Sequence, residues 1–341
     1  MKIFVDTSPL QTGHAVRGVG FYTKELTKAL GTNKKVALVE SENKADVVHY
    51  PFFDLFFLTL PSKKKKPVVV TVHDVIPLLY PKEYKPGIRG KAKFLIQKNR
   101  LKKVDAIITD SETSRKDIVR LLDIPKEKVF VTYLAPADRF RPITNHQSLI
   151  ITRKEYNLPE SFVLYVGDVN YNKNVQGLLR AFSLITNHPS LITNLVLVGK
   201  AFTTDSSELR EIIHLIKQLK IEDKVKILGF VSDRDLVMIY NLASVVCQPS
   251  FYEGFGFPVL EAQACGSPVV AAKTQCLVEM SEGSCIFINP HQPSDIADGL
   301  KRVLKDTKLQ KQLVLNGKKN VSKYSWENTA EETIKVYEKL V

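Results

Sequence analysis

Short runs of apolar, mostly β-branched residues alternate with helical patterns along both halves of this 341-residue chain. This alternation strongly constrains the fold, because parallel strands need long crossover connections, which helices usually supply. In the first half we predict strands at residues 2–6, 36–39, 46–49, 68–72, 106–109 and 129–133. In the second half we predict strands at residues 162–166, 195–198, 225–228, 245–248, 269–271 and 286–288. The sequence therefore predicts an α/β protein with doubly wound parallel sheets.

A polar, irregular segment between Pro142 and Leu158 divides the alternating pattern in two. The chain length fits two domains at about 150 residues each. We predict one Rossmann-like domain over residues 1–150 and a second over residues 151–325. We expect the last helix, residues 326–341, to cross back to the first domain.

Polar side chains and glycines follow several predicted strands directly, at the carboxyl ends where open parallel sheets bind ligands. In the first half these residues are His73, Asp74, Asp110 and Ser111. In the second half they lie in the segments 167–173, 199–200 and 249–253. We expect the two sheets to face each other by these edges across one cleft.

Cysteine spacing and apolar stretches exclude several classes of protein. No pair of cysteines has CxxC spacing, so neither a zinc site nor a disulfide framework is indicated. The cysteines are Cys247, Cys265, Cys276 and Cys285. The longest apolar stretch, residues 51–61, is shorter than the about 20 residues that a membrane helix requires. The first five residues resemble a strand rather than a secretory signal. We therefore expect a cytoplasmic protein with reduced cysteines.

The net charge of +13 is unevenly distributed. Residues 60–105 contain thirteen lysines and arginines and three acidic residues, a local net charge of +10. One interpretation is a solvated basic surface. The other is peripheral contact with an anionic membrane at its inner face, or with a lipid-phosphate acceptor. Nucleic acid is disfavoured, because the four-lysine run, residues 63–66, has no interleaved aromatic side chains.

The segment 249–270 combines a glycine-rich turn, a short helix and a strand. Pro258 is predicted near the helix start and Gly266 at its end. The backbone amides of the turn, Gly254, Phe255 and Gly256, together with the positive end of the helix, suit a diphosphate.

Two carboxylates in this segment, Glu253 and Glu261, are separated by seven residues. They can reach different parts of one ligand: Glu261 the ribose hydroxyls of a nucleotide and Glu253 a sugar. The alternative for Glu261 is a first-turn acid favoured by the helix dipole.

This segment resembles the Glu-x7-Glu signature of family 4 of retaining glycosyltransferases, which have the GT-B fold. The resemblance covers most of the chain, and it is closest to bacterial mannosyltransferase-type members that act on surface polysaccharides. It implies an N-terminal acceptor domain, a C-terminal donor domain and a cleft between them.

Other segments resemble further motifs of the family. Gly18-Val19-Gly20 is similar to the family's first glycine-rich loop, which lies near the donor phosphates. The segment 72–77 is similar to the family segment whose histidine, here His73, lies beside the donor sugar. The segment 162–174 resembles the strand and loop that contain Gly167 and Lys173. The segment 228–231 resembles the base-contacting turn, with Phe230 and Val231, and the segment 324–327 the start of the final helix.

The resemblance implies catalytic and donor-binding roles for specific residues. The implied catalytic residues are His73, Lys173 and Glu253. The implied donor-binding residues are Gly18, Val19, Gly20, Gly167, Lys173, Phe230, Val231, Glu253, Gly254, Phe255, Gly256 and Glu261. The role of Lys173 also follows from chemistry, because a fixed cation stabilises the charge that builds up on a leaving diphosphate. For His73 we expect a hydrogen bond to the sugar; the alternative is a local backbone contact.

We expect no metal ion and no other cofactor. The segment Asp233-Arg234-Asp235 matches a metal-binding pattern, but it opens a predicted helix, where acids are expected as caps. One residue departs from the family: Asp168 follows Gly167 where many relatives have a phosphate-binding arginine. Lys200 is a candidate replacement.

The predicted reaction is retaining transfer of a sugar to a glycan or lipid-linked acceptor, from GDP-mannose first and a UDP-sugar second. One alternative is a nucleotide-sugar epimerase or glycan phosphorylase of similar architecture. Another is a non-catalytic, lipid-associated protein that binds nucleotides. We interpret Ser111 as a helix N-cap, and we assign no role to the other histidines, including His49 and His291.

Overall fold

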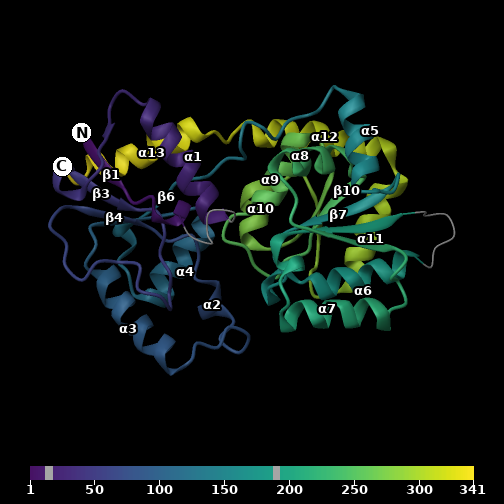
Figure 1. Cartoon of the computed structure of the whole chain (residues 1–341), viewed down its shortest axis with the longest axis horizontal. Coiled ribbons are helices and arrows are strands. Elements are labelled where there is room, and N and C mark those ends of the chain that lie inside the picture. Colours follow the sequence, from purple (N-terminus) through teal and green to yellow (C-terminus); the bar gives the residue numbers. More distant parts are fainter. Residues whose placement is uncertain (12–17, 187–192) are drawn as a thin grey trace. The chain divides into compact units, whose positions relative to one another are not determined.

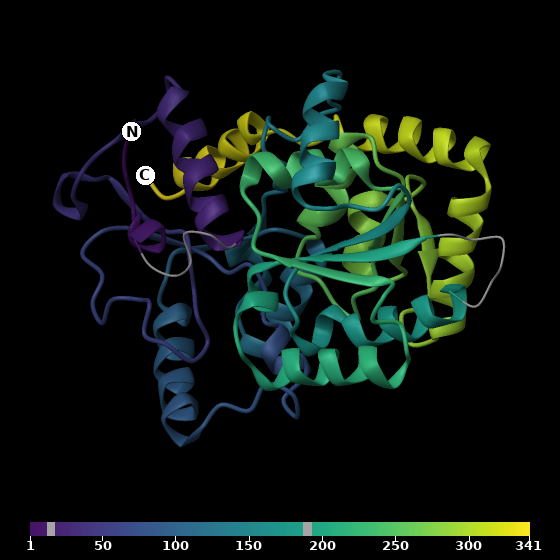
Figure 2. The same cartoon turned by 45° about the vertical axis from the view of Figure 1, so that its right-hand side comes forward.

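The computed structural model describes residues 1–11, 18–186 and 193–341. The chain divides into two compact units (Figure 1). The first unit contains Met1–Ala135 and Tyr324–Val341, and the second contains Pro136–Lys323. Both termini of the chain therefore lie on the first unit (Figure 2).

In the described part of the first unit, six parallel strands form one sheet in the order β2-β1-β3-β4-β5-β6. The strands are β1 (Lys2–Val5), β2 (Ala37–Leu38), β3 (Val47–Tyr50), β4 (Val68–Thr71), β5 (Ala106–Thr109) and β6 (Val129–Val131). The α-helices are α1 (Gly18–Thr32), α2 (Ile76–Leu79), α3 (Ile88–Lys102), α4 (Glu112–Leu122) and α13 (Trp326–Glu338). Single turns of 3-10 helix are η1 (Ser8–Gln11), η2 (Glu42–Lys44) and η3 (Lys126–Lys128).

The second unit has a parallel sheet of six strands within the described ranges, in the order β12-β11-β10-β7-β8-β9. The strands are β7 (Phe162–Val166), β8 (Asn194–Val198), β9 (Val225–Gly229), β10 (Val245–Gln248), β11 (Val269–Ala272) and β12 (Ile286–Ile288). The helices are α5 (His146–Glu155), α6 (Val175–Thr186), α7 (Ser207–Gln218), α8 (Asp233–Leu242), α9 (Phe257–Cys265), α10 (Gln275–Ser281), α11 (Pro293–Lys305) and α12 (Thr307–Val321), with 3-10 turns η4 (Tyr171–Lys173) and η5 (Lys200–Thr203). The predicted α/β class is confirmed.

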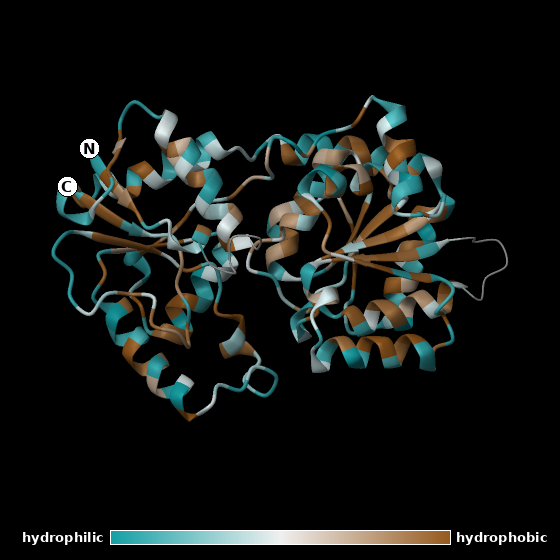
Figure 3. Ribbon diagram, viewed as in Figure 1, coloured by the Kyte–Doolittle hydropathy of each residue, from teal (hydrophilic) through white to brown (hydrophobic). Residues whose placement is uncertain are grey.

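The strands read as nearly continuous apolar runs because helices cover both faces of each sheet. Every residue of β3, β4, β5, β10 and β11 is buried. In Figure 3 the strands of the second unit are coloured as hydrophobic, and several covering helices have one hydrophobic and one hydrophilic side.

The boundary between the units lies at Ala135 and Pro136 rather than at residue 150. The intervening residues pack on the second unit: Ile143 N donates to Asn241 Oδ1 at 2.8 Å, and the rings of Phe140 and Tyr240 are 5.8 Å apart. A change in polarity along the chain therefore marks the boundary less accurately than these contacts.

A buried polar network fixes α13 to the first sheet. His49, at 0% exposure, contacts the Tyr337 hydroxyl through Nδ1 at 2.6 Å and Thr71 Oγ1 through Nε2 at 2.8 Å. Thr71 Oγ1 also lies 2.9 Å from the Tyr22 hydroxyl. Burial, together with the charge of His73, lowers the pKa of His49 to about 3, so its ring is neutral at physiological pH. His49, to which the sequence assigned no role, is therefore a structural residue.

The cysteines, all within the described ranges, are buried and form no disulfide. Among the described residues, none of the helices combines the length and the hydropathy that a membrane span requires.

Candidate functional site

The second sheet has a topological switch point between β7 and β10. The chain proceeds from β7 to β8 and β9 on one side, and β10, β11 and β12 lie on the other. Loops that follow the two central strands diverge, and the crevice between them is where sheets of this kind bind ligands. The β7 loop contains Gly167 and Lys173, and the β10 loop contains Glu253. Sequence prediction placed both loops at this edge.

Lys173 and Glu253 form a close ion pair at the switch point. Lys173 Nζ donates to Glu253 Oε2 at 2.8 Å and to Oε1 at 3.0 Å. Glu253 is only 5% exposed, and its Oε1 also accepts hydrogen bonds from Gln248 Nε2 at 2.7 Å and Ser250 Oγ at 2.6 Å. The carboxylate is thus held in one orientation by donors from its own loop and from the end of β10.

Asparagines on either side of Lys173 connect the two loops. Asn172 Nδ2 donates to Tyr252 O at 3.0 Å, and its backbone carbonyl accepts from Phe251 N at 2.8 Å. Asn174 Nδ2 donates to Pro249 O at 3.0 Å, while its Oδ1 accepts from Gly177 N at 3.2 Å in the first turn of α6. These contacts determine where Lys173 lies.

Sequence reasoning did not identify Asn174 as a positioning residue. Its φ of 54° lies in the left-handed region, which asparagine tolerates better than most residues. An asparagine directly before an apolar helical pattern was the available signal.

The glycine-rich turn leads directly into α9. Gly256 has a φ of 111°, and a Cβ at this position would lie 2.7 Å from Leu277 Cδ2. Pro258 is the second residue of α9, and Gly266, with a φ of 80°, ends the helix. The predicted turn, helix and termination are confirmed. Gly254 and Phe255 are buried in the turn.

Glu261 is the fifth residue of α9, so the alternative interpretation as a first-turn acid is wrong. Its Oε2 accepts a hydrogen bond from the Tyr240 hydroxyl at 2.9 Å. Burial raises the pKa of Glu261 to about 7, although the Tyr240 hydrogen bond and the charge of Arg139 oppose this shift. A carboxyl group with such a perturbed pKa is a candidate functional residue.

On the other side of the switch point, the ends of β7, β8 and β9 approach closely. A Cβ on Gly199 would lie 1.9 Å from the carbonyl oxygen of Gly167, so residue 199 must be glycine. Lys200 comes directly after this contact and begins η5. At the end of β9, Phe230 is 54% exposed and Val231 is buried.

Asp168 takes part in local hydrogen bonds. Its carbonyl accepts from the Tyr165 hydroxyl at 2.6 Å, and its Oδ1 accepts from Val169 N at 2.8 Å. The side chain therefore orders the loop that precedes Lys173.

In the first unit, His73 follows β4 and pairs with Asp110, which follows β5. His73 Nδ1 lies 2.7 Å from Asp110 Oδ2, and Nε2 lies 3.2 Å from the carbonyl oxygen of Pro51. With Asp110 ionised both partners are acceptors, and both bonds then form only if both ring nitrogens carry a proton. Burial lowers the pKa of His73, but Asp110, Asp74 and the Pro51 carbonyl together raise it by more, so the pKa lies above its ordinary value. The raised pKa favours the imidazolium form of the ring, which also contacts Tyr22 edge-on with 4.7 Å between the ring centroids.

Asp110 was noted at a strand end but was not assigned to the site. Its other oxygen, Oδ1, is buried and has no hydrogen-bond partner among the described residues. The next residue, Ser111, accepts a hydrogen bond from Ser114 N at 3.0 Å, which confirms the predicted N-cap of α4.

Gly18, Val19 and Gly20 form the first turn of α1 rather than a loop before it. Glycine lacks a side chain that would shield the amides of a helix N-terminus, and among the described residues no atom lies within 4 Å of the position that a Cβ of Gly18 would take. The segment predicted as a glycine-rich loop is therefore helical.

The acidic pair in α8 has structural partners. Asp233 Oδ2 lies 2.9 Å from Arg139 Nη2, and Asp235 Oδ2 accepts from Ser232 Oγ at 2.7 Å and Tyr156 hydroxyl at 2.8 Å. The N-cap of α8 is Ser232, whose side chain accepts from Asp235 N, so the two acids are first-turn residues rather than caps as predicted. No cluster of three potential metal ligands occurs among the residues that the structure describes.

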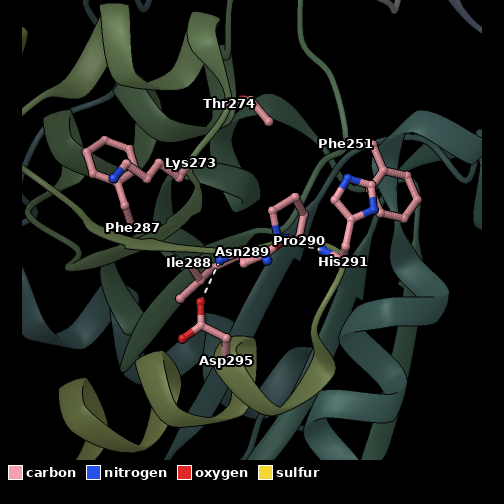
Figure 4. Close-up of a pocket in the computed structure, with 9 residues that line it drawn as sticks. All are labelled: Phe251, Lys273, Thr274, Phe287, Ile288, Asn289, Pro290, His291 and Asp295. Atoms are coloured by element: carbon pink, nitrogen blue, oxygen red, sulfur yellow. Dashed lines mark hydrogen bonds between the residues drawn. The ribbon is translucent and has the colours of Figure 1, made fainter.

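A cavity of ≈ 370 Å³ lies beside the Glu253 loop, at the carboxyl ends of β11 and β12. Its wall includes the ring of Phe251, on which His291 stacks with 4.8 Å between centroids and an angle of 15° (Figure 4). Across the cavity, Asp295 Oδ2 accepts from Asn289 N at 2.6 Å. The cavity wall thus combines aromatic side chains with polar groups, as small-molecule sites do.

The two halves of the chain match two family models. Residues 6–135 match "Glycosyltransferase Family 4" and residues 150–320 match "Glycosyl transferases group 1". The chain is 30% identical to O-antigen chain mannosyltransferase B of Escherichia coli over 82% of this chain and 72% of that protein. It is 27% identical to the serotype-specific mannosyltransferase WbdA of Escherichia coli over 84% of this chain, but only 35% of WbdA.

The solved structure of Anabaena HepE in complex with UDP and glucose has the same fold. The two chains are 16% identical, with a TM-score of 0.78 over 99% of each. This likeness supports the GT-B fold that the sequence predicted. The matches to both family models and the 30% identity over most of the chain show that the protein belongs to glycosyltransferase family 4, the glycosyl transferases group 1.

Proposed function

We propose that this glycosyltransferase transfers mannose from GDP-mannose to a glycan or lipid-linked acceptor, with retention of anomeric configuration and without a metal ion. The observation that carries the proposal is the Lys173–Glu253 pair at the switch point. The similarity to two bacterial mannosyltransferases favours mannose. A UDP-sugar is the second candidate donor, since the structurally similar HepE has been solved with UDP and glucose.

In this reaction the bond between the sugar and the diphosphate breaks while the acceptor oxygen bonds to the anomeric carbon. Negative charge builds up on the departing diphosphate. Lys173 lies where it can neutralise that charge, and the amides that begin α9 can share it. The acceptor proton passes to the departing phosphate oxygen, so no protein nucleophile is required.

The remaining groups hold the two ends of the donor. Glu261 accepts hydrogen bonds from the ribose hydroxyls, and Glu253 accepts them from the sugar while it orients Lys173. The exposed ring of Phe230 and the backbone of Val231 contact the base. His73 supplies a hydrogen bond to the sugar through Nε2, in place of the bond to the Pro51 carbonyl.

The test is an assay with radiolabelled GDP-mannose and a panel of lipid-linked and soluble mannosyl acceptors, followed by NMR of the product's anomeric proton. We expect an α-mannoside and unchanged rates in excess EDTA. Loss of activity in EDTA that manganese restores would refute the metal-free mechanism. An inverted product would refute retention.

Two alternative functions have distinct outcomes in the same assay. An epimerase would convert GDP-mannose into an isomeric sugar nucleotide without an acceptor. A binding protein would be thermally stabilised by GDP-mannose but would release no GDP. The intact set of Lys173, Glu253 and Glu261 favours transfer over both.

A further inference from the structure

A cavity of ≈ 320 Å³ lies at the amino-terminal edge of the first sheet. Its walls include the start of β4 at Val68 and the residue Val104, which comes shortly before β5. His73 and Asp110 follow the opposite, carboxyl ends of these same two strands. The cavity is therefore separate from the candidate catalytic residues of this unit, and its role does not depend on the proposed reaction.

The lining of this cavity is basic around an apolar floor. The floor includes Leu60, Pro61, Val68 and Val104. The basic side chains are Lys63, Lys64, Arg100 and Lys103, and the lining contains no acidic residue within the described part of the chain. Arg100 Nη1 donates to the carbonyl of Leu60, and Lys64 Nζ lies 2.6 Å from Asp105. The walls of the cavity are thus held in place, while Lys63 and Lys103 are exposed.

The chemistry of this lining matches a phosphate ester with an attached apolar group. Lysine ammonium groups and an arginine guanidinium bind phosphate oxygens, and the apolar floor would contact a hydrocarbon segment beside the phosphate. A free phosphate ion would use the basic groups only.

The helix that contributes Arg100 presents apolar side chains to solvent. On α3, Ile88 is 90% exposed, Leu95 67% and Ile96 44%. Successive residues of an α-helix are rotated by about 100° around its axis, so these three side chains lie on the same side of the helix as the cavity residue Arg100. Residues 84–104 contain no acidic residue. A surface helix with this combination is typical of contact with an anionic lipid interface.

A rigid turn beside α3 extends this apolar surface. Phe57 is 64% exposed and Leu58 49%. Asp54 Oδ1 accepts from Phe57 N at 2.9 Å, and Lys93 Nζ lies 5.0 Å from the centre of the Phe57 ring. These contacts hold the turn in a conformation in which the Phe57 side chain is exposed.

We propose that the basic cavity binds the phosphate of an anionic phospholipid and that the exposed apolar side chains of α3 and of Phe57 and Leu58 enter the lipid interface. Most of this docking surface lies within residues 60–105, the basic stretch for which the sequence left membrane contact open. The apolar side chains select a phospholipid over a soluble phosphate ester, because only a lipid would cover them.

The experiment is sedimentation of the full chain with vesicles of phosphatidylcholine, with or without phosphatidylglycerol. The test variant is K63S/K103S, and the matched control is K24S/K116S, which removes the same charge from exposed positions on α1 and α4. We expect the test variant to bind phosphatidylglycerol vesicles about 30-fold more weakly than wild type, as two basic residues near an anionic surface predict. The control should bind within about threefold of wild type. Equal losses of vesicle binding in both variants would refute the cavity as the binding site. Absence of vesicle binding by wild type would refute it as well.

A second variant, I88S/L95S, tests the apolar contact. Wild type should retain part of its vesicle binding at about 1 M salt, where charges are screened beyond about 3 Å, and this variant should lose it. Retention by the variant would refute apolar insertion.

A third measurement separates the two sources of phosphate. Glycerol 3-phosphate should not change the unfolding temperature of wild type. Stabilisation by this ester that K63S/K103S abolishes, without vesicle binding, would refute the phospholipid and identify a soluble ligand. Thermal unfolding followed by circular dichroism should confirm that all variants fold.

Discussion

Both carboxylate oxygens of Glu253 accept hydrogen bonds from Lys173 Nζ, at 2.8 Å and 3.0 Å, across loops that follow different strands. The pair joins the two sides of the switch point. A diphosphate that approaches Lys173 therefore competes with Glu253 for the same ammonium group. This competition makes the effects of substitutions at the two residues distinguishable.

Replacing Glu253 by glutamine should separate binding from catalysis. Because the neutral amide holds the ammonium less strongly, we expect E253Q to bind GDP at least as tightly as wild type but to lose transfer about 100-fold or more. Calorimetry gives the Kd for GDP, and radiolabelled transfer gives kcat. The control is E222Q, at an exposed position in the same unit. Weaker GDP binding by E253Q would contradict the competition.

Replacing Lys173 by methionine should affect stability as well as activity. It leaves the buried Glu253 carboxylate without its cation, at a cost of about 3–5 kcal/mol in the free energy of unfolding. The double variant K173M/E253Q removes both charges and should recover most of this stability without recovering transfer. Urea unfolding measures the free energy of unfolding, and GDP release measures transfer. A stable but inactive K173M would mean that Glu253 does not require the pair.

The pH dependence of stability should reveal the His73–Asp110 pair. Asp110 raises the pKa of His73 above its unfolded value of about 6.5, so protonated His73 stabilises the folded state fully below that pH. This contribution is lost as the pH rises through the folded pKa. In D110N the shift should disappear, and the free energy of unfolding should fall less between neutral and alkaline pH than in wild type. NMR titration of the His73 ring checks the pKa directly; an unchanged value in D110N would contradict the assignment.

Tyr337 should stabilise the first unit through His49. The variant Y337F removes the hydroxyl that lies 2.6 Å from His49 Nδ1 and leaves that buried nitrogen without its partner. We expect a loss of about 1–3 kcal/mol in the free energy of unfolding. Urea denaturation measures it, with Y324F, near the start of α13, as the control. A loss no larger than in Y324F would show that His49 does not anchor α13.

Local sequence patterns predicted several elements correctly because their causes are local. Gly256 and Gly266 occupy left-handed conformations at the two ends of α9, and Ser111 caps α4 through its own side chain. In the same way, Lys173 and Glu253 were placed at one edge because parallel strands end there. The beginning of α1 at Gly18 was not predicted, because glycine is typical of turns and this segment was interpreted as a loop, although glycine can also begin a helix.

The sequence by itself determined the α/β class, the succession of strands and helices, and the family. Tertiary structure alone decided that β7 and β10 are neighbours, that Asp110 pairs with His73 and raises its pKa, and that His49 holds the last helix 288 positions away in the chain. The physical reason is that periodicity and turn chemistry depend on neighbouring residues, whereas strand order and the pairing of buried polar groups depend on contacts between segments far apart in the sequence.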